Sequence, residues 1–252
     1  ARHSSRLGRM CGVSQATLGW PVENWVEPIR PTGASLCGVH VELHLLTRED
    51  HAAELFAAFG KADGLWAYLP YGPFASVAAY GDWIDQNAQS SDPTFYALID
   101  KSNQKAVGVA SYLRINPSAG SIEVGHICLS PQVQKTKAAT EAMFLMMQWA
   151  FGAGYRRYEW KCDALNLPSR RAAARLGLSY EGVFRQMSIV KGRNRDTAWF
   201  AAVDGEWPQL RDAFNAWLAA ENFMQTGQQL ASLSDMTAPL LSLKDPLSHP
   251  SK

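Results

Sequence analysis

A strand that runs through a proline turn into a helix start of small residues is the feature that most constrains the fold. It spans Ile122 to Glu141 and reads IEVGHICLSPQVQKTKAATE. The first turn of a helix offers up to about four backbone N–H groups without intrahelical partners, at the positive end of the helix dipole. Such helix starts bind phosphate. The segment therefore predicts a phosphate cradle that begins near Gln134.

The helix that follows this turn has an apolar face. Apolar residues recur at three- and four-residue spacing, which predicts that one side of the helix is buried: Ala139, Ala142, Met143, Met146 and Ala150. The same segment also fits a simpler interpretation, in which a core helix starts after a proline, is capped by a threonine and exposes its lysines. The residues alone leave both interpretations open.

The segment resembles the cofactor motif of the GNAT superfamily of N-acetyltransferases. In that motif a Gln or Arg starts a six-residue turn that ends in Gly or Ala and holds the pyrophosphate of acetyl-CoA. Gln134 and Ala139 occupy the two ends here, and Lys137 replaces the middle glycine. The resemblance implies acetyl-CoA as cofactor, bound by the strand end and the turn: Ile127, Cys128, Leu129, Gln134, Lys135, Thr136, Lys137, Ala138, Ala139 and Thr140.

A second motif lies downstream, where residues 166–169 read Asn-Leu-Pro-Ser. It resembles the RimJ and RimL branch of the family, the ribosomal-protein acetyltransferases. The resemblance implies that Asn166 contacts the pantetheine arm and that Ser169 lies close to the thioester sulfur. Asn166 is also a good N-cap for a helix with Pro168 in its first turn, so a purely structural role fits as well.

The chemistry of acetyl transfer points to candidate catalytic groups, because an amine attacks a thioester only when it is neutral. Near pH 7.4 about one lysine side chain in a thousand is neutral, against roughly a fifth to a third of α-amines. Glu123 is the only carboxylate in the strand before the turn, and the resemblance implies a general base acting through a water. We predict Glu123 as base, with Ser169 and His126 as further catalytic residues.

His126 has the better intrinsic pKa for a base near neutral pH. Strand alternation, however, predicts that it points away from Glu123, where a hydrogen-bonded core histidine is the alternative. Many family members use a tyrosine seven residues after the asparagine to protonate the departing thiolate. Ala173 occupies that position, so no tyrosine acid is expected from that helix.

Two segments are candidates for recognising the acceptor. The loop from Trp66 to Phe74 holds four aromatic residues that we predict as the wall of an acceptor pocket: Trp66, Tyr68, Tyr71 and Phe74. Packing beneath a long loop explains them as well. A turn predicted from Lys191 to Asp196 carries three basic residues that attract a carboxylate or phosphate, or are simply solvated: Lys191, Arg193 and Arg195.

The order of expected elements gives the fold class. A strand, two helices, three strands, a helix, a strand, a helix and two strands predict an α/β chain, and the resemblance implies a GNAT-type mixed, mostly antiparallel central sheet flanked by helices on both faces. In that fold the strand before the turn splays from its neighbour to admit pantetheine. We divide the chain into an irregular leader (1–36), the GNAT domain (37–205), a C-terminal helix (206–225) and a frayed tail (226–252).

Charge and composition exclude other classes of protein. The 252 residues carry a net charge of +1, which does not favour nucleic-acid or membrane binding. No apolar run approaches the roughly 20 residues that span a bilayer, and the start of the chain lacks the apolar core of a secretory signal. We therefore expect a cytoplasmic protein, monomeric or homodimeric. The four cysteines show no paired short spacing, so no metal site is expected.

Together these patterns predict an acetyl-CoA-dependent N-acetyltransferase in which a neutral primary amine attacks the thioester directly. The acceptor is either a protein N-terminal α-amine or a small amine metabolite or antibiotic. The alternative is a non-catalytic acyl-CoA-binding or regulatory module on the same fold, which Lys137 and Ala173 keep open.

Overall fold

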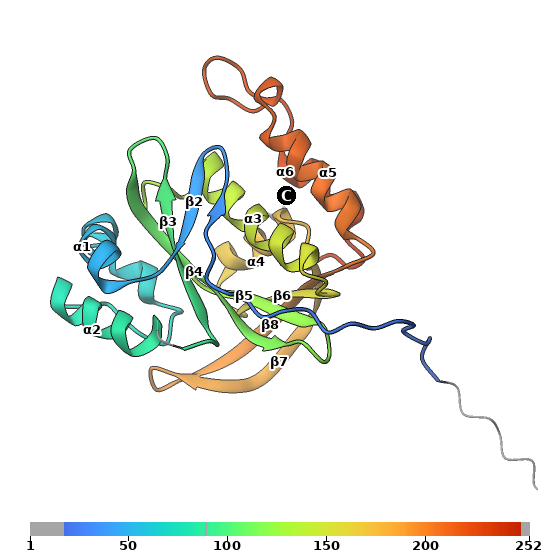
Figure 1. Ribbon diagram of the computed structural model, residues 1–252, viewed down its shortest axis with the longest axis horizontal. Coiled ribbons are helices and arrows are strands. Elements are labelled where there is room, and N and C mark those ends of the chain that lie inside the picture. The colour runs from blue at the N-terminus through green and yellow to red at the C-terminus, as the bar shows by residue number, and fades with distance from the viewer. Residues whose placement is uncertain (1–17, 89, 248–252) are drawn as a thin grey trace, which may run out of the picture.

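A single eight-stranded sheet lies between two layers of helices in the computed structural model, which describes residues 18–88 and 90–247 (Figure 1). The strands follow the order β1-β2-β3-β4-β5-β6-β8-β7. Each neighbouring pair is antiparallel except β5 and β6, which are parallel. The expected mixed, mostly antiparallel sheet with helices on both faces is confirmed.

The strands are β1 (Leu36–Cys37), β2 (Val41–Leu45), β3 (Thr94–Asp100), β4 (Lys105–Asn116), β5 (Ser121–Leu129), β6 (Arg157–Asp163), β7 (Ser179–Val190) and β8 (Arg193–Val203). The α-helices are α1 (Arg48–Phe59), α2 (Val77–Ala88), α3 (Lys137–Gly152), α4 (Leu167–Arg175), α5 (Trp207–Leu218) and α6 (Leu233–Thr237). Short 3-10 turns are η1 (Asp63–Trp66), η2 (Ala220–Asn222) and η3 (Ala238–Leu240).

Local sequence signals set several helix ends. Thr47 caps α1 by accepting a hydrogen bond from the N–H of Asp50. Asn166 caps α4 in the same way, because its side-chain oxygen accepts from the N–H of Ser169 at 3.1 Å. Gly177 follows α4 with a φ of 85°, a left-handed conformation that costs glycine little and stops the helix.

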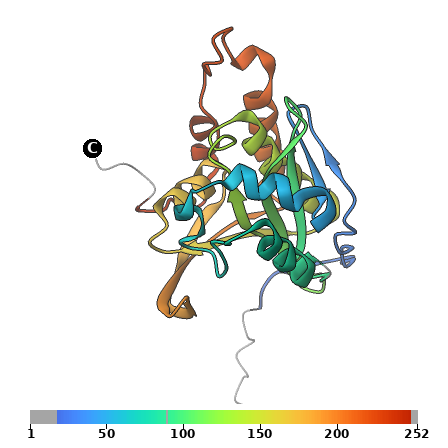
Figure 2. The same cartoon turned by 90° about the vertical axis from the view of Figure 1, so that its left-hand side faces the viewer.

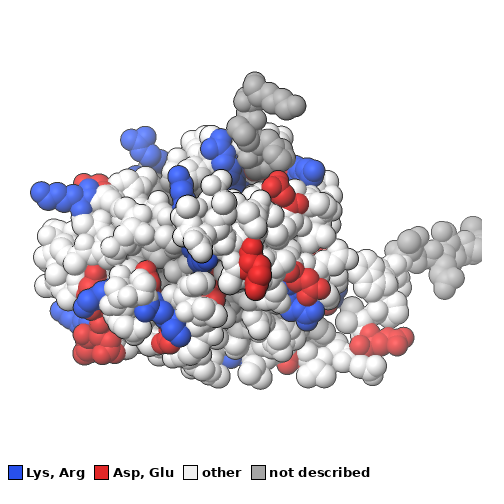
Figure 3. Space-filling view, turned by 90° about the horizontal axis from the view of Figure 1, so that it is seen from above, with Lys and Arg blue, Asp and Glu red and all other residues white. Residues whose placement is uncertain are grey.

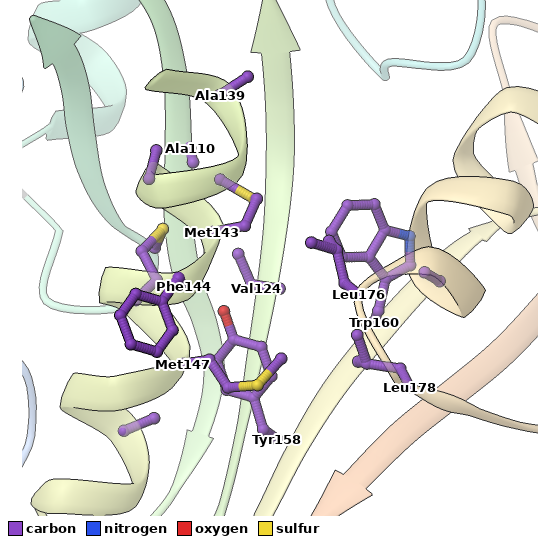
Figure 4. Close-up of a cluster of buried hydrophobic side chains, with 14 of the residues drawn as sticks. Ala110, Val124, Ala139, Met143, Phe144, Met147, Tyr158, Trp160, Leu176 and Leu178 are labelled. Carbon is purple, nitrogen blue, oxygen red and sulfur yellow. The ribbon is translucent and has the colours of Figure 1, made fainter. Parts of the chain in front are cut away.

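Two hydrophobic clusters fill the two faces of the sheet. In the larger one, Met143 and Met147 of α3 pack over Val124 of β5 and Tyr158 of β6 (Figure 4). The smaller cluster lies beneath α1 and α2, which pack on β4 and β3. The α1–α2 pair therefore covers the part of its face formed by β3 and β4 (Figure 1), and the site described below lies where β5 and β6 diverge.

The described part of the C-terminal segment, residues 226–247, includes a helix and buried residues, which corrects the prediction that the tail is frayed from residue 226. Leu233 and Thr237 of α6 are fully buried. Beyond α6, Asp245 is 1% exposed and accepts two hydrogen bonds from the buried guanidinium of Arg170 on α4. The prediction was wrong because the Ser-, Pro- and Leu-containing sequence shows no local signal of structure, whereas Arg170, far away in sequence, binds Asp245.

Other boundaries also differ from the predictions. The C-terminal helix predicted within residues 206–225 is shorter, because α5 ends at Leu218 and is followed only by η2. The turn predicted from Lys191 to Asp196 is shorter, since β7 ends at Val190 and β8 begins at Arg193. Arg193 and Arg195 are therefore strand residues, because cross-strand pairing continues almost to the hairpin tip.

The described part of the predicted leader, residues 18–35, forms no helix or strand. The Tyr155 hydroxyl donates to the carbonyl of Ile29, and the Arg30 guanidinium donates to the carbonyl of Ile115, so the leader is tied to the sheet near β4. The first part of the predicted leader lies outside the described residues.

The surface seen from above carries lysine and arginine side chains scattered among acidic ones (Figure 3). No extended patch of one sign appears on that face. Within the described ranges, no helix has the length and apolar character needed to cross a bilayer.

Candidate active site

The divergence of β5 from β6 defines the candidate site. The two strands pair in parallel from Ser121 with Arg157 to Val124 with Trp160, and they separate beyond this last pair (Figure 4). Cys128 and Leu129 stay paired with β4 on their other side. In the described chain, the edge of residues 127–129 that faces β6 therefore has no strand partner. The splay expected from the resemblance is present.

A β-bulge at His126 accompanies this divergence. His126 has a φ of 52°, and the register between β4 and β5 shifts between the pairs Ser111–Gly125 and Val109–Cys128. The extra residue breaks strand alternation, so His126 packs against Phe95 on the α1–α2 face. Glu123 lies on this face too, because its neighbours Ile122 and Val124 point into the cluster beneath α3. The prediction that His126 points away from Glu123 was wrong.

The turn after β5 presents free backbone donors. Thr136 caps α3 by accepting from the N–H of Ala139 at 3.3 Å, and the Gln134 side chain donates to the carbonyl of Leu129. The N–H groups of Lys135, Lys137 and Ala138 make no hydrogen bond in the described chain. Because these donors lie at a helix start, the predicted turn has the form of an anion-binding site.

The ammonium of Lys137 lies over an aromatic ring. Its Nζ lies 3.4 Å from the centroid of the Phe223 ring, in the segment after η2. Ala138, Ala139 and Thr140 are buried, so small side chains keep the helix start close to the sheet. A lysine in place of the expected glycine is accommodated here by a cation–π contact.

The start of α4 brings Asn166 and Ser169 to the β6 side of the divergence. The Trp160 indole donates to the Ser169 hydroxyl oxygen at 3.0 Å. Burial raises the pKa of Cys162 to about 11, and Ser169 acts in the opposite direction. Ala173 is fully buried, so that position supplies no acid.

Glu123 is the centre of a charge network on the α1–α2 face. Its side chain is 3% exposed, with Arg114 Nη1 at 2.7 Å and Lys161 Nζ at 2.9 Å. Lys161 also pairs with Glu159 at 2.7 Å. Burial raises the pKa of Glu123, against the opposing charges of Lys161 and Arg114. The sequence analysis missed Lys161 and Arg114, although alternation on β6 places Glu159 and Lys161 on one face.

Burial lowers the pKa of His126 to about 4, and the charges of Arg114 and Arg195 act in the same direction. The imidazole is therefore neutral near pH 7. Its Nδ1 lies 3.2 Å from the Tyr71 hydroxyl. Its lowered pKa makes His126 a weaker base than an ordinary histidine, whereas the raised pKa of Glu123 makes that carboxylate a stronger base than an ordinary one.

This shift predicts a specific loss of stability in acid. An unfolded histidine has a pKa of about 6.5, so the unfolded chain binds more protons than the native one as the pH falls from about 6.5 towards 4. We expect His126 alone to cost roughly 2 kcal/mol of unfolding free energy at pH 5 relative to pH 7.5. Melting temperatures of the wild type and His126→Gln at both pH values test this. The substitution should reduce the acid loss, and equal losses would contradict the assignment.

The aromatic loop between α1 and α2 divides into two parts. Trp66 and Phe74 pack edge-to-face in the smaller core cluster, and Trp66 is only 5% exposed. Tyr71 stacks on His126, and the Tyr68 hydroxyl donates to the carbonyl of Leu165 before α4. Of the four predicted acceptor residues, the structure therefore brings Tyr71 and Tyr68 to the candidate site and places the other two mainly in the core.

The hairpin of β7 and β8 reaches the same loop. The ammonium of Lys191 donates to the carbonyls of Trp66 at 2.8 Å and Gly72 at 2.7 Å. This contact also corrects the picture of Lys191 as a solvated tip residue. Backbone carbonyls give no sequence signal, so the contact was not predictable from the chain.

Comparison with known proteins now identifies the fold family. Residues 40–179 match the family model described as acetyltransferase (GNAT) domain. The chain belongs to the GNAT acetyltransferase family. Members of this family use acetyl-CoA as the acetyl donor. No curated protein was found to match the chain.

Solved structures of the GNAT family support this assignment. A GCN5-related N-acetyltransferase from Brucella melitensis is 45% identical, with a TM-score of 0.84 over 86% of this chain and 99% of that one. A probable acetyltransferase of the GNAT family from Chromobacterium violaceum is 38% identical, with a TM-score of 0.73 over 77% and 98%. The microcin C7 self immunity acetyltransferase, solved with acetyl-CoA and AMP, shares the fold at 21% identity and a TM-score of 0.59, over 66% of this chain and 93% of that one.

Proposed function

We propose that this GNAT protein transfers the acetyl group of acetyl-CoA to a primary amine. One observation carries the proposal. At its C-terminal end, β5 separates from β6 and leads into a turn with three free N–H groups. A strand edge without a partner suits an extended amide chain such as pantetheine, and the free donors suit its diphosphate.

The chain's own residues divide the work of binding. The N–H groups of Lys135, Lys137 and Ala138 receive the diphosphate, in a turn shaped by Gln134, Thr136, Ala139 and Thr140. The free edge of Ile127 to Leu129 and the Asn166 amide hold the pantetheine arm. When bound, acetyl-CoA supplies an acetyl group on a thioester that a neutral amine attacks directly. Holding the two reactants together supplies much of the rate.

Glu123 is the proposed general base, acting through a water on the acceptor ammonium. Its raised pKa favours this role, whereas the low pKa of His126 argues against the histidine as base. Ser169 donates a hydrogen bond at the sulfur. A thiol with a pKa near 8.5 leaves without full protonation, so the buried Ala173 does not prevent turnover.

We propose a protein N-terminal α-amine or a small amine as acceptor, because an α-amine needs little help to lose its proton. The likeness to the RimJ and RimL branch supports an α-amine on chemical grounds. That the protein works in the cytoplasm, as a monomer or a homodimer, stays a prediction of the sequence.

A non-catalytic acyl-CoA-binding module is the second candidate function. Ala173 in place of an acid and Lys137 in the turn favour it. Release of free thiol from acetyl-CoA in the presence of peptides and small amines separates the two functions. Binding without acceptor-dependent thiol release would support the module.

Acetyl-CoA should raise the melting temperature, since a ligand of the native state stabilises it by mass action. At about 100 times the dissociation constant the gain is about 2.7 kcal/mol, or roughly 5 to 10 °C for a chain of this size. Lys135→Glu should weaken the shift at equal ligand, because it puts a carboxylate beside the diphosphate. Arg193→Glu, the same charge change at an exposed position outside the turn, should not. No shift at millimolar acetyl-CoA would contradict the proposal.

A further inference from the structure

We propose that the acceptor is a small primary amine that also carries a carboxylate or phosphate, and that Arg195 binds this anion. The inference deepens the proposed function and rests on it. It starts from a basic side chain on the site's face of the sheet that has no partner among the described residues.

Arg195 lies on β8 and faces the candidate site. Ala198 and Phe200 of β8 point into the cluster beneath α3, so Arg195 and Trp199 point to the opposite face by strand alternation. The Lys161 ammonium, which pairs with Glu123, lies 3.8 Å from the Trp199 ring centroid on that face. Arg195 therefore shares a face with the proposed base.

The charge of Arg195 affects the pKa of one residue on each of the two diverging strands, β5 and β6. It lowers the pKa of His126 on β5, and it also opposes the burial that raises the pKa of Cys162 on β6. Such influence falls off with distance in a screened medium. These two effects accord with the placement of Arg195 on the face of the sheet that carries Glu123.

Arg195 is unlike the other cations of this face. Arg114 pairs with Glu123, and Lys161 pairs with both Glu123 and Glu159. The Arg195 side chain forms no ion pair or hydrogen bond within the described chain, and its Nε is buried without an acceptor. A buried donor without a partner is costly to leave unsatisfied. A carboxylate or phosphate oxygen satisfies it and matches the planar guanidinium.

The roof of the site favours a small acceptor. The loop after α1 is fixed at three points. Its Tyr71 stacks on His126 of β5, and its Tyr68 donates a hydrogen bond to the connection between β6 and α4. Lys191, at the tip of the β7–β8 hairpin, donates to a backbone carbonyl of the loop. Figure 2 shows the hairpin of β7 and β8 and the α1–α2 elements on the side of the molecule that faces the viewer. A loop fixed at three points restricts entry of a folded protein. A small acceptor with its ammonium beside the Glu123 carboxylate and its anionic group at the Arg195 guanidinium places each of its charges next to the opposite charge.

Matched pairs of acceptors test the proposal. β-Alanine, glycine and O-phosphoethanolamine are compared with β-alaninamide, glycinamide and ethanolamine, which lack the anion. Binding to CoA-saturated protein is measured by calorimetry, and kcat/KM by thiol release. We expect at least a tenfold preference for one or more anionic members, since hydrogen bonds to charged groups are the strong ones. The carboxylate and phosphate arms separate the two anions.

Two variants assign the preference to its residue. Arg195→Gln should raise the KM of the anionic acceptor at least tenfold and leave the KM of acetyl-CoA unchanged. Arg193→Gln, at an exposed position on the same strand, should leave both unchanged. Equal binding of anionic and neutral members, no binding of any anionic member, or better use of a peptide with a free N-terminus would overturn the proposal. Acetyl-CoA binding is measured first, so its failure identifies a failure of the proposed function instead.

Discussion

Replacing Glu123 by Gln lowers kcat about a hundredfold while the protein stays folded. Positioned general bases contribute about a hundredfold to ten-thousandfold, and Gln keeps the size of the side chain while removing its basicity. The acceptor amine is mostly charged near neutral pH. Without the base, the rate therefore depends on the fraction of the amine that is neutral in solution. Initial rates of thiol release at saturating acetyl-CoA measure the effect. The KM of acetyl-CoA should change little, because Glu123 lies on the α1–α2 face and outside the diphosphate turn.

Glu159→Gln is the matched control for this result. Glu159 pairs with the same Lys161 ammonium at 2.7 Å, lies on the same face and is also buried. Its loss removes the same charge from the network without removing the proposed base. If both variants slow the reaction equally, Glu123 acts through the shared electrostatics and the base assignment is wrong. Melting temperatures of both variants exclude misfolding as the cause.

A pH profile separates the proposed base from His126. Burial raises the pKa of Glu123 above its usual value, so kcat/KM should rise with pH as this carboxyl loses its proton. That rise should persist in His126→Gln. If the rise disappears in His126→Gln and survives in Glu123→Gln, the two roles are reversed.

Local signals in the sequence predict most of the fold. Apolar runs bounded by polar turns predict strands at 94–100 and 121–129, which are the observed bounds of β3 and β5. Thr47 with Asp50 three positions on predicts a cap for a helix that begins at Arg48, and the structure confirms it. The turn at Gln134 was predicted from its small and basic residues, and its free N–H groups follow from the helix start itself.

The features that the sequence did not reveal depend on contacts between distant residues. The bulge at His126 depends on register with β4, and no residue pattern in β5 marks it. Lys191 binds backbone carbonyls of a loop more than a hundred positions away. The pairing of Lys161 with Glu123 crosses between parallel strands separated by α3. For this reason the turn at Gln134 was predictable from the sequence, whereas the charge network around Glu123 was not.

The largest expected change in stability comes from Asp245→Ala in the C-terminal segment. Asp245 accepts from the Arg170 guanidinium at 2.8 and 2.5 Å, and the two residues are 1% and 2% exposed. Removing one partner of a buried pair leaves an uncompensated charge, which costs about 3 to 5 kcal/mol. For a chain of this size the melting temperature should fall by roughly 10 °C. Asp212→Ala, which breaks an exposed pair with Arg211, should cost under about 1 kcal/mol.

The C-terminal segment is connected to the candidate site through Arg170 of α4. Arg170 follows Ser169 on α4 and also donates to the carbonyl of Ala164, near the Asn166 cap. Loss of Asp245 should therefore raise the KM of acetyl-CoA as well as lower stability. The reason is that it loosens the start of α4, which carries the side chains of Asn166 and Ser169. The double variant Arg170→Met with Asp245→Leu should recover most of the melting temperature, since replacing a whole buried pair by apolar residues is often neutral. A fall no larger than that of Asp212→Ala would show that the tail contributes little to holding α4.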